Sequence, residues 1–143
     1  MKIVPAHSDD ISEFSEIEFA NMAPLFADNP EWIISSVEAA IRENKERAWK
    51  LIGDELLGFY YWVPDEDCAV LLSIQVPQRH QSKGYGSRLL AHFHTEATAH
   101  QFTKLGLAVH TRNRAYQWYV KNGFVYHQHD GPDCHMLVKE VQL

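Results

Sequence analysis

Glycines, amides and cations gather in one short stretch of the chain, Gln81-Ser-Lys-Gly-Tyr-Gly86. An apolar run, Leu71–Val76, comes just before it and predicts a buried strand. Apolar residues at helical spacing follow it and predict an amphipathic helix. Glycine lets backbone approach a ligand closely, and a helix start presents unpaired N–H groups with partial positive charge. This strand-to-helix turn can therefore hold a phosphate, with Arg79, Lys83 and Arg88 as nearby cations.

The stretch matches neither of two common phosphate-binding patterns. Leu89 stands where the dinucleotide-binding pattern needs a third glycine, and no Gly-Lys-Ser/Thr follows as in a Walker loop. Taken by itself, the glycine pair is equally compatible with an ordinary strand-to-helix turn.

Composition favours a single globular domain over residues 1–143. The chain has 143 residues, of which 45% are hydrophobic, enough for a substantial core. The N-terminal MKIVPAHSDD lacks the apolar stretch of a signal peptide, and no run approaches the ~18 apolar residues of a membrane span. We therefore expect a cytoplasmic protein with no membrane partner. Cys68 and Cys134 form no motif and are expected to be free thiols.

The net charge of −6 is unevenly distributed along the chain. Residues 1–67 hold 15 acidic and 5 basic side chains, whereas residues 68–129 hold 7 basic side chains and one acidic one. A basic middle in an acidic protein favours a local polyanionic ligand over nucleic acid bound along a whole face. The acidic first half suits a cationic second ligand, or else forms solvated helix faces.

Periodicity and turn residues predict the element order βααβββαβαββ. Strands are expected at 2–6, 48–52, 56–63, 68–76, 104–110, 124–129 and 135–141, with a turn over Pro64–Asp67; helices are expected from Ser8 or Asp9 to about Asn21, from Asn29 to about Glu46, from Gly84 to about His100, and over 114–121. The fold class is α/β (α+β), with a mixed, mostly antiparallel sheet of six to seven strands and helices on both faces. The segment 68–110 is the only parallel crossover, so its two strands should lie side by side.

Two motifs, taken together, resemble the GCN5-related N-acetyltransferase (GNAT) family. Gln81-Ser-Lys-Gly-Tyr-Gly86 is similar to the family's Gln/Arg-x-x-Gly-x-Gly/Ala loop, which follows an apolar strand. Asn113-Arg-Ala-Tyr-Gln-Trp-Tyr119-Val-Lys-Asn-Gly-Phe124 matches the family's Asn-x-x-Ala-x-x-x-Tyr-x-x-x-Gly-Phe segment almost position for position. The detailed resemblance covers about residues 68–126, and the first 67 residues match only in element order.

The resemblance implies an enzyme that binds acetyl-CoA as cosubstrate, without a metal. The pantetheine arm would add like a short strand to backbone near Ile74 and Val76, where the central parallel strands splay apart. The pyrophosphate would sit on the amides of the glycine loop, and Asn113 would bond the pantetheine. The implied acetyl-CoA-binding residues are Ile74, Val76, Gln81, Ser82, Lys83, Gly84, Tyr85, Gly86, Ser87, Asn113 and Tyr119.

The resemblance makes Tyr119 the candidate general acid. The amine attacks the thioester directly, and the leaving thiol has a pKa of about 8.5 against about 10 for tyrosine. Tyr119 can therefore bond the departing thiolate and supply a proton. A backbone N–H near Ile74 or Val76 would polarise the carbonyl. The alternative for Tyr119 is core packing beside Tyr116 and Trp118.

The general base is left open by the sequence. A substrate ammonium with a pKa of about 10 must lose a proton before it attacks. Some relatives carry a carboxylate on the central strand, but the strand 68–76 has none. Water relayed through Ser73, His110 at the end of the neighbouring strand, and Glu18 in the helical region are the three alternatives.

The nine histidines do not predict a metal site. His92 and His94 are two residues apart on a helix and diverge. His127 and His129 share a strand face, but no third ligand has suitable spacing.

These features together predict an N-acetyltransferase acting on a small cationic amine or a protein amino group, and a homodimer is compatible with them. The alternatives are a non-catalytic acyl-CoA-binding or sensor module and an acetyltransferase of RNA-linked amines, although an acidic first half would repel RNA phosphates. We expect the amine between the first two helices and the 55–64 strand, where Tyr60, Tyr61 and Trp62 alternate so that one face can offer an aromatic wall. The acidic candidates on that side are Glu13, Glu16, Glu18, Asp28 and Glu31.

Overall fold

The computed structural model describes residues 1–143, which divide into two compact units. The first unit joins Met1–Trp62 to Ser73–Phe93, and the second joins Val63–Leu72 to His94–Leu143. The strands are β1 (Lys2–Pro5), β2 (Ala48–Ile52), β3 (Leu56–Asp65), β4 (Cys68–Gln75), β5 (Lys104–His110), β6 (Val125–Asp130) and β7 (Cys134–Glu140). The helices are α1 (Ile11–Phe26), α2 (Ile34–Glu43), α3 (Tyr85–Ala99) and α4 (Ala115–Lys121), with 3₁₀ turns at Ser8–Asp10, Lys45–Arg47 and Gln78–His80.

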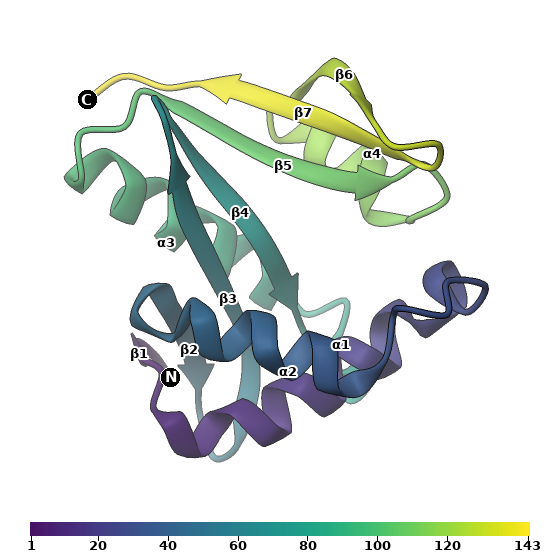
Figure 1. Cartoon of the computed structure of the whole chain (residues 1–143). Coiled ribbons are helices and arrows are strands. Elements are labelled where there is room, and N and C mark those ends of the chain that lie inside the picture. Colours follow the sequence, from purple (N-terminus) through teal and green to yellow (C-terminus); the bar gives the residue numbers. More distant parts are fainter. The chain divides into compact units, whose positions relative to one another are not determined.

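The predicted element order and fold class are confirmed. Figure 1 follows the chain through a helical pair, a run of three strands, and then alternating helices and strands. The seven strands are hydrogen-bonded in the order β1-β2-β3-β4-β5-β7-β6. β4 and β5 pair in parallel, as the crossover at 68–110 predicts.

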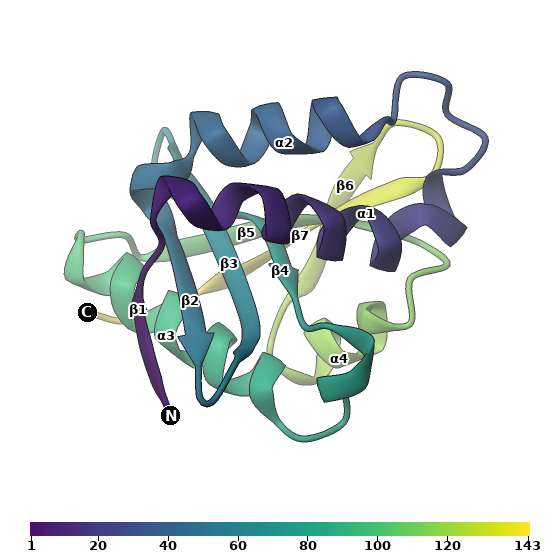
Figure 2. The same cartoon turned by 90° about the horizontal axis from the view of Figure 1, so that it is seen from below.

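The first unit builds a core on each face of its strands. β1, β2 and β3 pair antiparallel, and α1 and α2 lie side by side on one face (Figures 1 and 2). Phe14 of α1 stacks on Phe59 of β3 with ring centroids 4.1 Å apart. Residues of β3 alternate between faces, so Tyr60 and Trp62 point the other way and pack against Phe93 of α3, at 5.8 and 6.3 Å.

The expected aromatic wall at Tyr60, Tyr61 and Trp62 is therefore wrong. All three side chains are buried. Tyr60 and Trp62 belong to the core beneath α3, because burying such large rings there stabilises the unit more than leaving them exposed to meet a ligand. Only Tyr61 faces α1.

Gly58 lies where β3 approaches the end of β4. A Cβ atom added there would stand 2.8 Å from Leu89 Cδ1 and 2.9 Å from the carbonyl oxygen of Gln75. We expect Gly58→Ala to lower the free energy of unfolding by about 1–3 kcal/mol, because backbone cannot move aside as a flexible side chain can. Urea denaturation measures this, with Gly53→Ala as control, since its Cβ would meet only the Leu57 side chain, at 3.3 Å. Equal stability of the two variants would contradict this packing.

Helix α1 is longer than predicted. It runs through Pro24 to Phe26 instead of ending near Asn21. Pro24 removes one helical hydrogen bond, to the carbonyl of Ala20, but both residues are exposed, so water can satisfy that carbonyl. The cap predicted at Ser8 or Asp9 is not formed: these residues lie in a 3₁₀ turn, and the Asp10 carboxylate accepts the N–H of His7, which precedes the turn, at 2.8 Å.

Helix α2 begins later than predicted, at Ile34 rather than at Asn29, and it ends at Glu43 rather than near Glu46. The Asn29 side chain accepts the Glu31 N–H at 2.9 Å and so forms a turn instead of a cap. The N-cap residue is Ile33, whose side chain forms no cap hydrogen bond; its own N–H donates to Ser36 Oγ at 3.2 Å.

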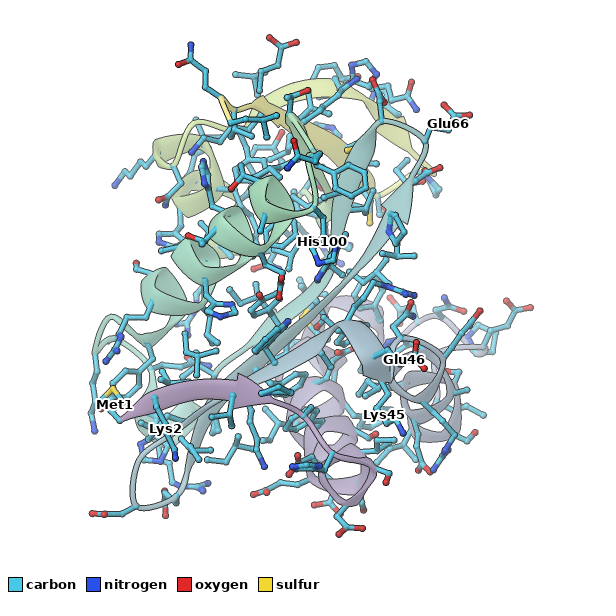
Figure 3. The ribbon with its side chains drawn as sticks, turned by 90° about the vertical axis from the view of Figure 1, so that its left-hand side faces the viewer. Met1, Lys2, Lys45, Glu46, Glu66 and His100 are labelled. Carbon is cyan, nitrogen blue, oxygen red and sulfur yellow. The ribbon has the colours of Figure 1, made fainter.

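The second unit has one parallel and two antiparallel strand pairs. Cys68–Leu71 of β4 pair in parallel with Lys104–Leu107 of β5, and β5 and β6 each pair antiparallel with β7. The turn before β4 is tighter than the predicted Pro64–Asp67, because β3 continues to Asp65. Figure 3 shows Glu66 at the tip of this turn, where its φ of 55° is left-handed.

None of the helices combines the length and the apolarity that crossing a membrane would require.

Candidate functional site

The glycine loop of the first unit has the backbone of an anion-binding turn. It connects the 3₁₀ turn after β4 to the start of α3, and both Ser82 (φ 66°) and Gly84 (φ 86°) are left-handed. A Cβ at Gly84 would meet nothing within 4 Å, so the glycine is required by the backbone angle and not by lack of space. Left-handed residues next to a helix start turn successive N–H groups toward one concavity, which favours a phosphate.

The cations around this loop are not equivalent. Arg79 Nε lies 2.9 Å from Glu55 Oε1, and the His80 ring contacts the same carboxylate. The hydrogen bond from Arg79 is the largest reason that the pKa of Glu55 is lowered. Lys83 is exposed and forms no ion pair in the structure. Lys83 is therefore available to a bound anion, whereas Arg79 is paired with Glu55 in the β2–β3 turn and Arg88 donates to the sulfur of Met1.

The carbonyl oxygen of Val76, directly after β4, already accepts two hydrogen bonds within the protein. Val76 O accepts Asn21 Nδ2 and Gln81 Nε2, each at 3.0 Å. A carbonyl oxygen has two lone pairs, so this one has no acceptor capacity left. Any strand-like pairing of a ligand at Val76 must use its N–H instead.

A chain of polar side chains joins α1 to β3 and β4 inside the first unit. Tyr61 Oη donates to Glu18, at 3.0 Å from Oε1 and 3.3 Å from Oε2. Ser73 is a further hydrogen-bond partner of the same carboxylate. Gln75 Nε2 donates to Ser73 Oγ at 3.0 Å, and Asn21 Nδ2 donates to Gln75 Oε1 at 3.1 Å.

Burial dominates the electrostatics of this cluster. It raises the pKa of Glu18, and the hydrogen bonds from Ser73 and Tyr61 oppose that rise only in part. Burial and the neighbouring Glu18 charge hold the pKa of Tyr61 well above its usual range, so Tyr61 stays a donor. No lysine, arginine or histidine is paired with Glu18.

Sequence reasoning named Glu18 and Ser73 as separate alternatives and missed Tyr61, Gln75 and Asn21 as their partners. One signal was present: Ser73 and Gln75 alternate on a single face of an otherwise apolar strand, where unpaired polar groups are costly.

Tyr119 and Asn113 lie in the second unit. The Tyr119 ring is buried on α4 against Trp118 and Phe124, with centroids 5.1 and 5.9 Å apart. Burial alone raises the pKa of Tyr119, which keeps its hydroxyl protonated. Asn113 Oδ1 accepts the Ala115 N–H at 2.8 Å, which leaves the amide NH₂ and one lone pair of Oδ1 for a ligand. Gly123 (φ 95°) ends the helix in the predicted left-handed conformation.

His110, the third alternative for the base, is also in the second unit and is buried. Its Nδ1 accepts the Arg112 N–H at 3.0 Å, which fixes the proton of the neutral ring on Nε2. The ring thus has no lone pair left to accept a substrate proton.

The acetyl-CoA-binding residues expected from the sequence divide between the units. Ile74, Val76 and the segment 81–87 belong to the first unit, and Asn113 and Tyr119 to the second. No three His, Cys, Asp or Glu side chains are grouped as metal ligands in residues 1–143.

Several solved structures share this fold. The PaiA N-acetyltransferase of Thermoplasma acidophilum, in complex with coenzyme A, has a TM-score of 0.77 at 20% identity, over 97% of this chain and 98% of that one. A GNAT-family acetyltransferase of Staphylococcus aureus Mu50 has a TM-score of 0.82 at 14% identity, over 99% of both chains. The ribosomal-protein-S18-alanine N-acetyltransferase of Escherichia coli has a TM-score of 0.74 at 20% identity, over 99% of this chain and 94% of that one.

No curated protein matches the sequence. The sequence model of the Acetyltransferase (GNAT) family matches residues 9–124, which include both the glycine loop and the Asn113–Phe124 segment. With that match over most of the chain, and with the fold described above, the chain belongs to the acetyltransferase (GNAT) family.

Proposed function

We propose that this N-acetyltransferase, whose acetyl donor is acetyl-CoA, acetylates a primary amine that binds as a cation, with Tyr119 as general acid. The observation that carries the choice of a cationic acceptor is Glu18. It is a half-buried carboxylate with no basic partner, on the helix where the sequence places the amine. A buried carboxylate is stabilised by a cation, and a substrate ammonium supplies one.

The donor is assigned to the end of β4 and to the glycine loop. Pantetheine would pair with backbone at Ile74 and with the N–H of Val76, since the Val76 carbonyl is occupied. The pyrophosphate would accept hydrogen bonds from the amides of the segment 81–87, whose left-handed residues support this assignment, and Lys83 would add charge. Asn113 would donate its amide NH₂ to the pantetheine.

Tyr119 would act when the carbon–sulfur bond breaks. The nitrogen of the amine attacks the thioester carbon, and a thiolate leaves that needs a hydrogen-bond donor. Burial raises the pKa of Tyr119, which makes it a weaker acid but keeps its hydroxyl protonated, so it stays available as a hydrogen-bond donor to the thiolate. No covalent enzyme intermediate is required.

The test is a thiol-release assay with acetyl-CoA and an amine panel of spermidine, tyramine, trifluoroethylamine and a tripeptide beginning with alanine. The peptide is included because one structural relative acts on a ribosomal-protein alanine. We expect turnover with at least one member and micromolar binding of acetyl-CoA by calorimetry. Binding of acetyl-CoA with no turnover of any member would support the non-catalytic alternative instead.

Raising the salt concentration should lower kcat/KM for spermidine. Glu13, Glu16, Asp28 and Glu31 are exposed, so they can attract a cation at long range, and this attraction is screened within about 10 Å at 0.1 M salt. Trifluoroethylamine, which is uncharged at neutral pH, is the control and should show little salt dependence. A salt-independent kcat/KM for spermidine would count against a cationic acceptor without affecting the acetyl-CoA assignment.

A further inference from the structure

We propose that Glu18 is the general base that takes the proton from the acceptor ammonium, and that Tyr61 and Ser73 are the positioning residues that hold its carboxylate. This inference rests on the proposed function and assigns the base that the sequence leaves open.

The position of Glu18 is fixed from two strands at once. Tyr61 Oη on β3 lies within 3.3 Å of both carboxylate oxygens, and Ser73 on β4 is a second hydroxyl partner that lowers the pKa of this carboxyl group. Tyr61 is 2% exposed and Ser73 is 8% exposed, so both donors are locked by packing, while Glu18 itself is only half-buried. The carboxylate is thus oriented by the protein and still open to a small molecule.

The same cluster links Glu18 to the strand segment assigned to the donor. Ser73 precedes Ile74 directly, and the hydrogen bonds continue from Ser73 through Gln75 and Asn21 to the Val76 carbonyl. Glu18 is therefore connected by hydrogen bonds to the backbone proposed to pair with pantetheine. In this hydrogen-bonded series Tyr61 is connected to the strand segment only through Glu18, so Glu18 is the ionisable residue with fewer bonds between it and the segment.

The other two candidates for the base, His110 and Ser73, already use their lone pairs or hydroxyl in hydrogen bonds within the protein. His110 Nδ1 already accepts the Arg112 N–H, which leaves its ring no free lone pair. Ser73 accepts a hydrogen bond from Gln75 and donates toward Glu18, so it serves the carboxylate and has no base of its own. Only Glu18 combines a free lone pair with a half-exposed position.

The proton balance is complete with the groups named. The ammonium R–NH₃⁺ gives one proton to Glu18, which passes it to solvent after the reaction. The resulting amine attacks the thioester carbon, the C–S bond breaks, and Tyr119 protonates the departing sulfur. The nitrogen then loses a second proton through solvent, which restores the Tyr119 hydroxyl. The sum is acetyl-CoA and R–NH₃⁺ giving the acetamide, free CoA and one proton.

No group that contacts Glu18 changes its own charge in the pH range where Glu18 titrates. The partners of its carboxylate are Tyr61 of β3 and Ser73 of β4, and Gln75 and Asn21 are connected to it only through Ser73. Of these residues only Tyr61 is titratable, and it stays protonated. No charged side chain contributes to the raised pKa of Glu18. The raised pKa lies nearer to a working pH, which improves a carboxylate as a base.

The pH dependence of kcat/KM for spermidine tests the proposal. Wild type should fall only below the pKa of Glu18 and should be level above it, because the enzyme itself removes the ammonium proton. Glu18→Gln can still accept the Tyr61 hydrogen bond but has no base. It can acetylate only the fraction of the amine that is already unprotonated in solution. Its kcat/KM should be lower by roughly 10²–10⁴-fold at neutral pH and should rise about tenfold per pH unit toward the amine pKa of about 10.

Three controls separate a base from a structural residue. Glu43→Gln removes an exposed carboxylate from the first unit and should leave the profile unchanged. Tyr61→Phe removes a donor that lowers the pKa of Glu18, so the acid limb of its profile should move to higher pH. Trifluoroethylamine is already unprotonated at neutral pH, so Glu18→Gln should acetylate it at close to the wild-type rate.

A Glu18→Gln profile parallel to that of wild type, or an equal defect with trifluoroethylamine, would overturn the role of Glu18 while leaving the acetyltransferase intact. Acetyl-CoA binding to Glu18→Gln should match wild type by calorimetry. If wild type binds acetyl-CoA but releases no thiol with any amine of the panel, both the proposed acceptor class and the base assignment fail. If wild type does not bind acetyl-CoA, the proposed donor site fails first.

Discussion

Tyr119→Phe should lower kcat by roughly 10²–10⁴-fold, the usual contribution of a general acid. The ring of Tyr119 packs between Trp118 and Phe124, and phenylalanine keeps those contacts. The only loss is a hydroxyl whose raised pKa reflects burial alone, with no protein hydrogen bond to compensate. Stability and acetyl-CoA affinity should therefore stay close to wild type.

Single-turnover thiol release and calorimetry measure the two quantities separately. Tyr116→Phe is the matched control: it removes a hydroxyl from the same helix, one that bonds His135 Nδ1 at 2.7 Å. A loss in kcat below a few-fold for Tyr119→Phe, with chemistry shown to limit turnover, would leave Tyr119 as a packing residue.

Gly86→Asp should abolish acetyl-CoA binding. The residue lies in the first turn of α3, two positions after the left-handed Gly84, where backbone N–H groups have no partner within the helix. A carboxylate there would compete with the pyrophosphate for those amides and repel it. Because acidic residues near a helix start stabilise the helix, the variant should still fold. Wild-type affinity in the micromolar range corresponds to roughly −7 to −9 kcal/mol, and most of it should be lost.

Gly86→Asn separates charge from size in this experiment. It has nearly the same shape as the aspartate variant but no charge, so it should keep more of the affinity. Equal losses in the two variants would mean that bulk, not charge, excludes the ligand. Wild-type affinity in both would place the phosphates at another part of the chain.

Much of the fold could be predicted because the deciding information is local. Alternating apolar residues give β5 its predicted bounds, Lys104–His110, and Asn122-Gly123 ends α4 as the left-handed preference of glycine requires. The glycine loop is also local: its left-handed backbone at Gly84 depends on the residue itself. The family match over residues 9–124 includes these same short segments.

Helix ends were predicted less well, because competing local preferences are resolved by packing. Pro24 favours an end to α1, but Phe19 and Phe26 of that helix pack on Trp32, with centroids 4.4 and 5.6 Å apart. The energy of burying those rings exceeds the cost of one lost hydrogen bond at an exposed site. The same Trp32 lies in the turn that delays the start of α2.

The sequence by itself therefore determined the family, the order of elements and the loop that suits a phosphate, since each depends on residues close together in the chain. Only the tertiary structure decided how Glu18 is used. Its partner Tyr61 is 43 residues away, and Ser73 lies on another strand. No local pattern shows that a carboxylate will be buried beside two hydroxyl donors and no cation. That environment arises when α1 packs across β3 and β4, and it turns one of 19 acidic residues into a candidate base.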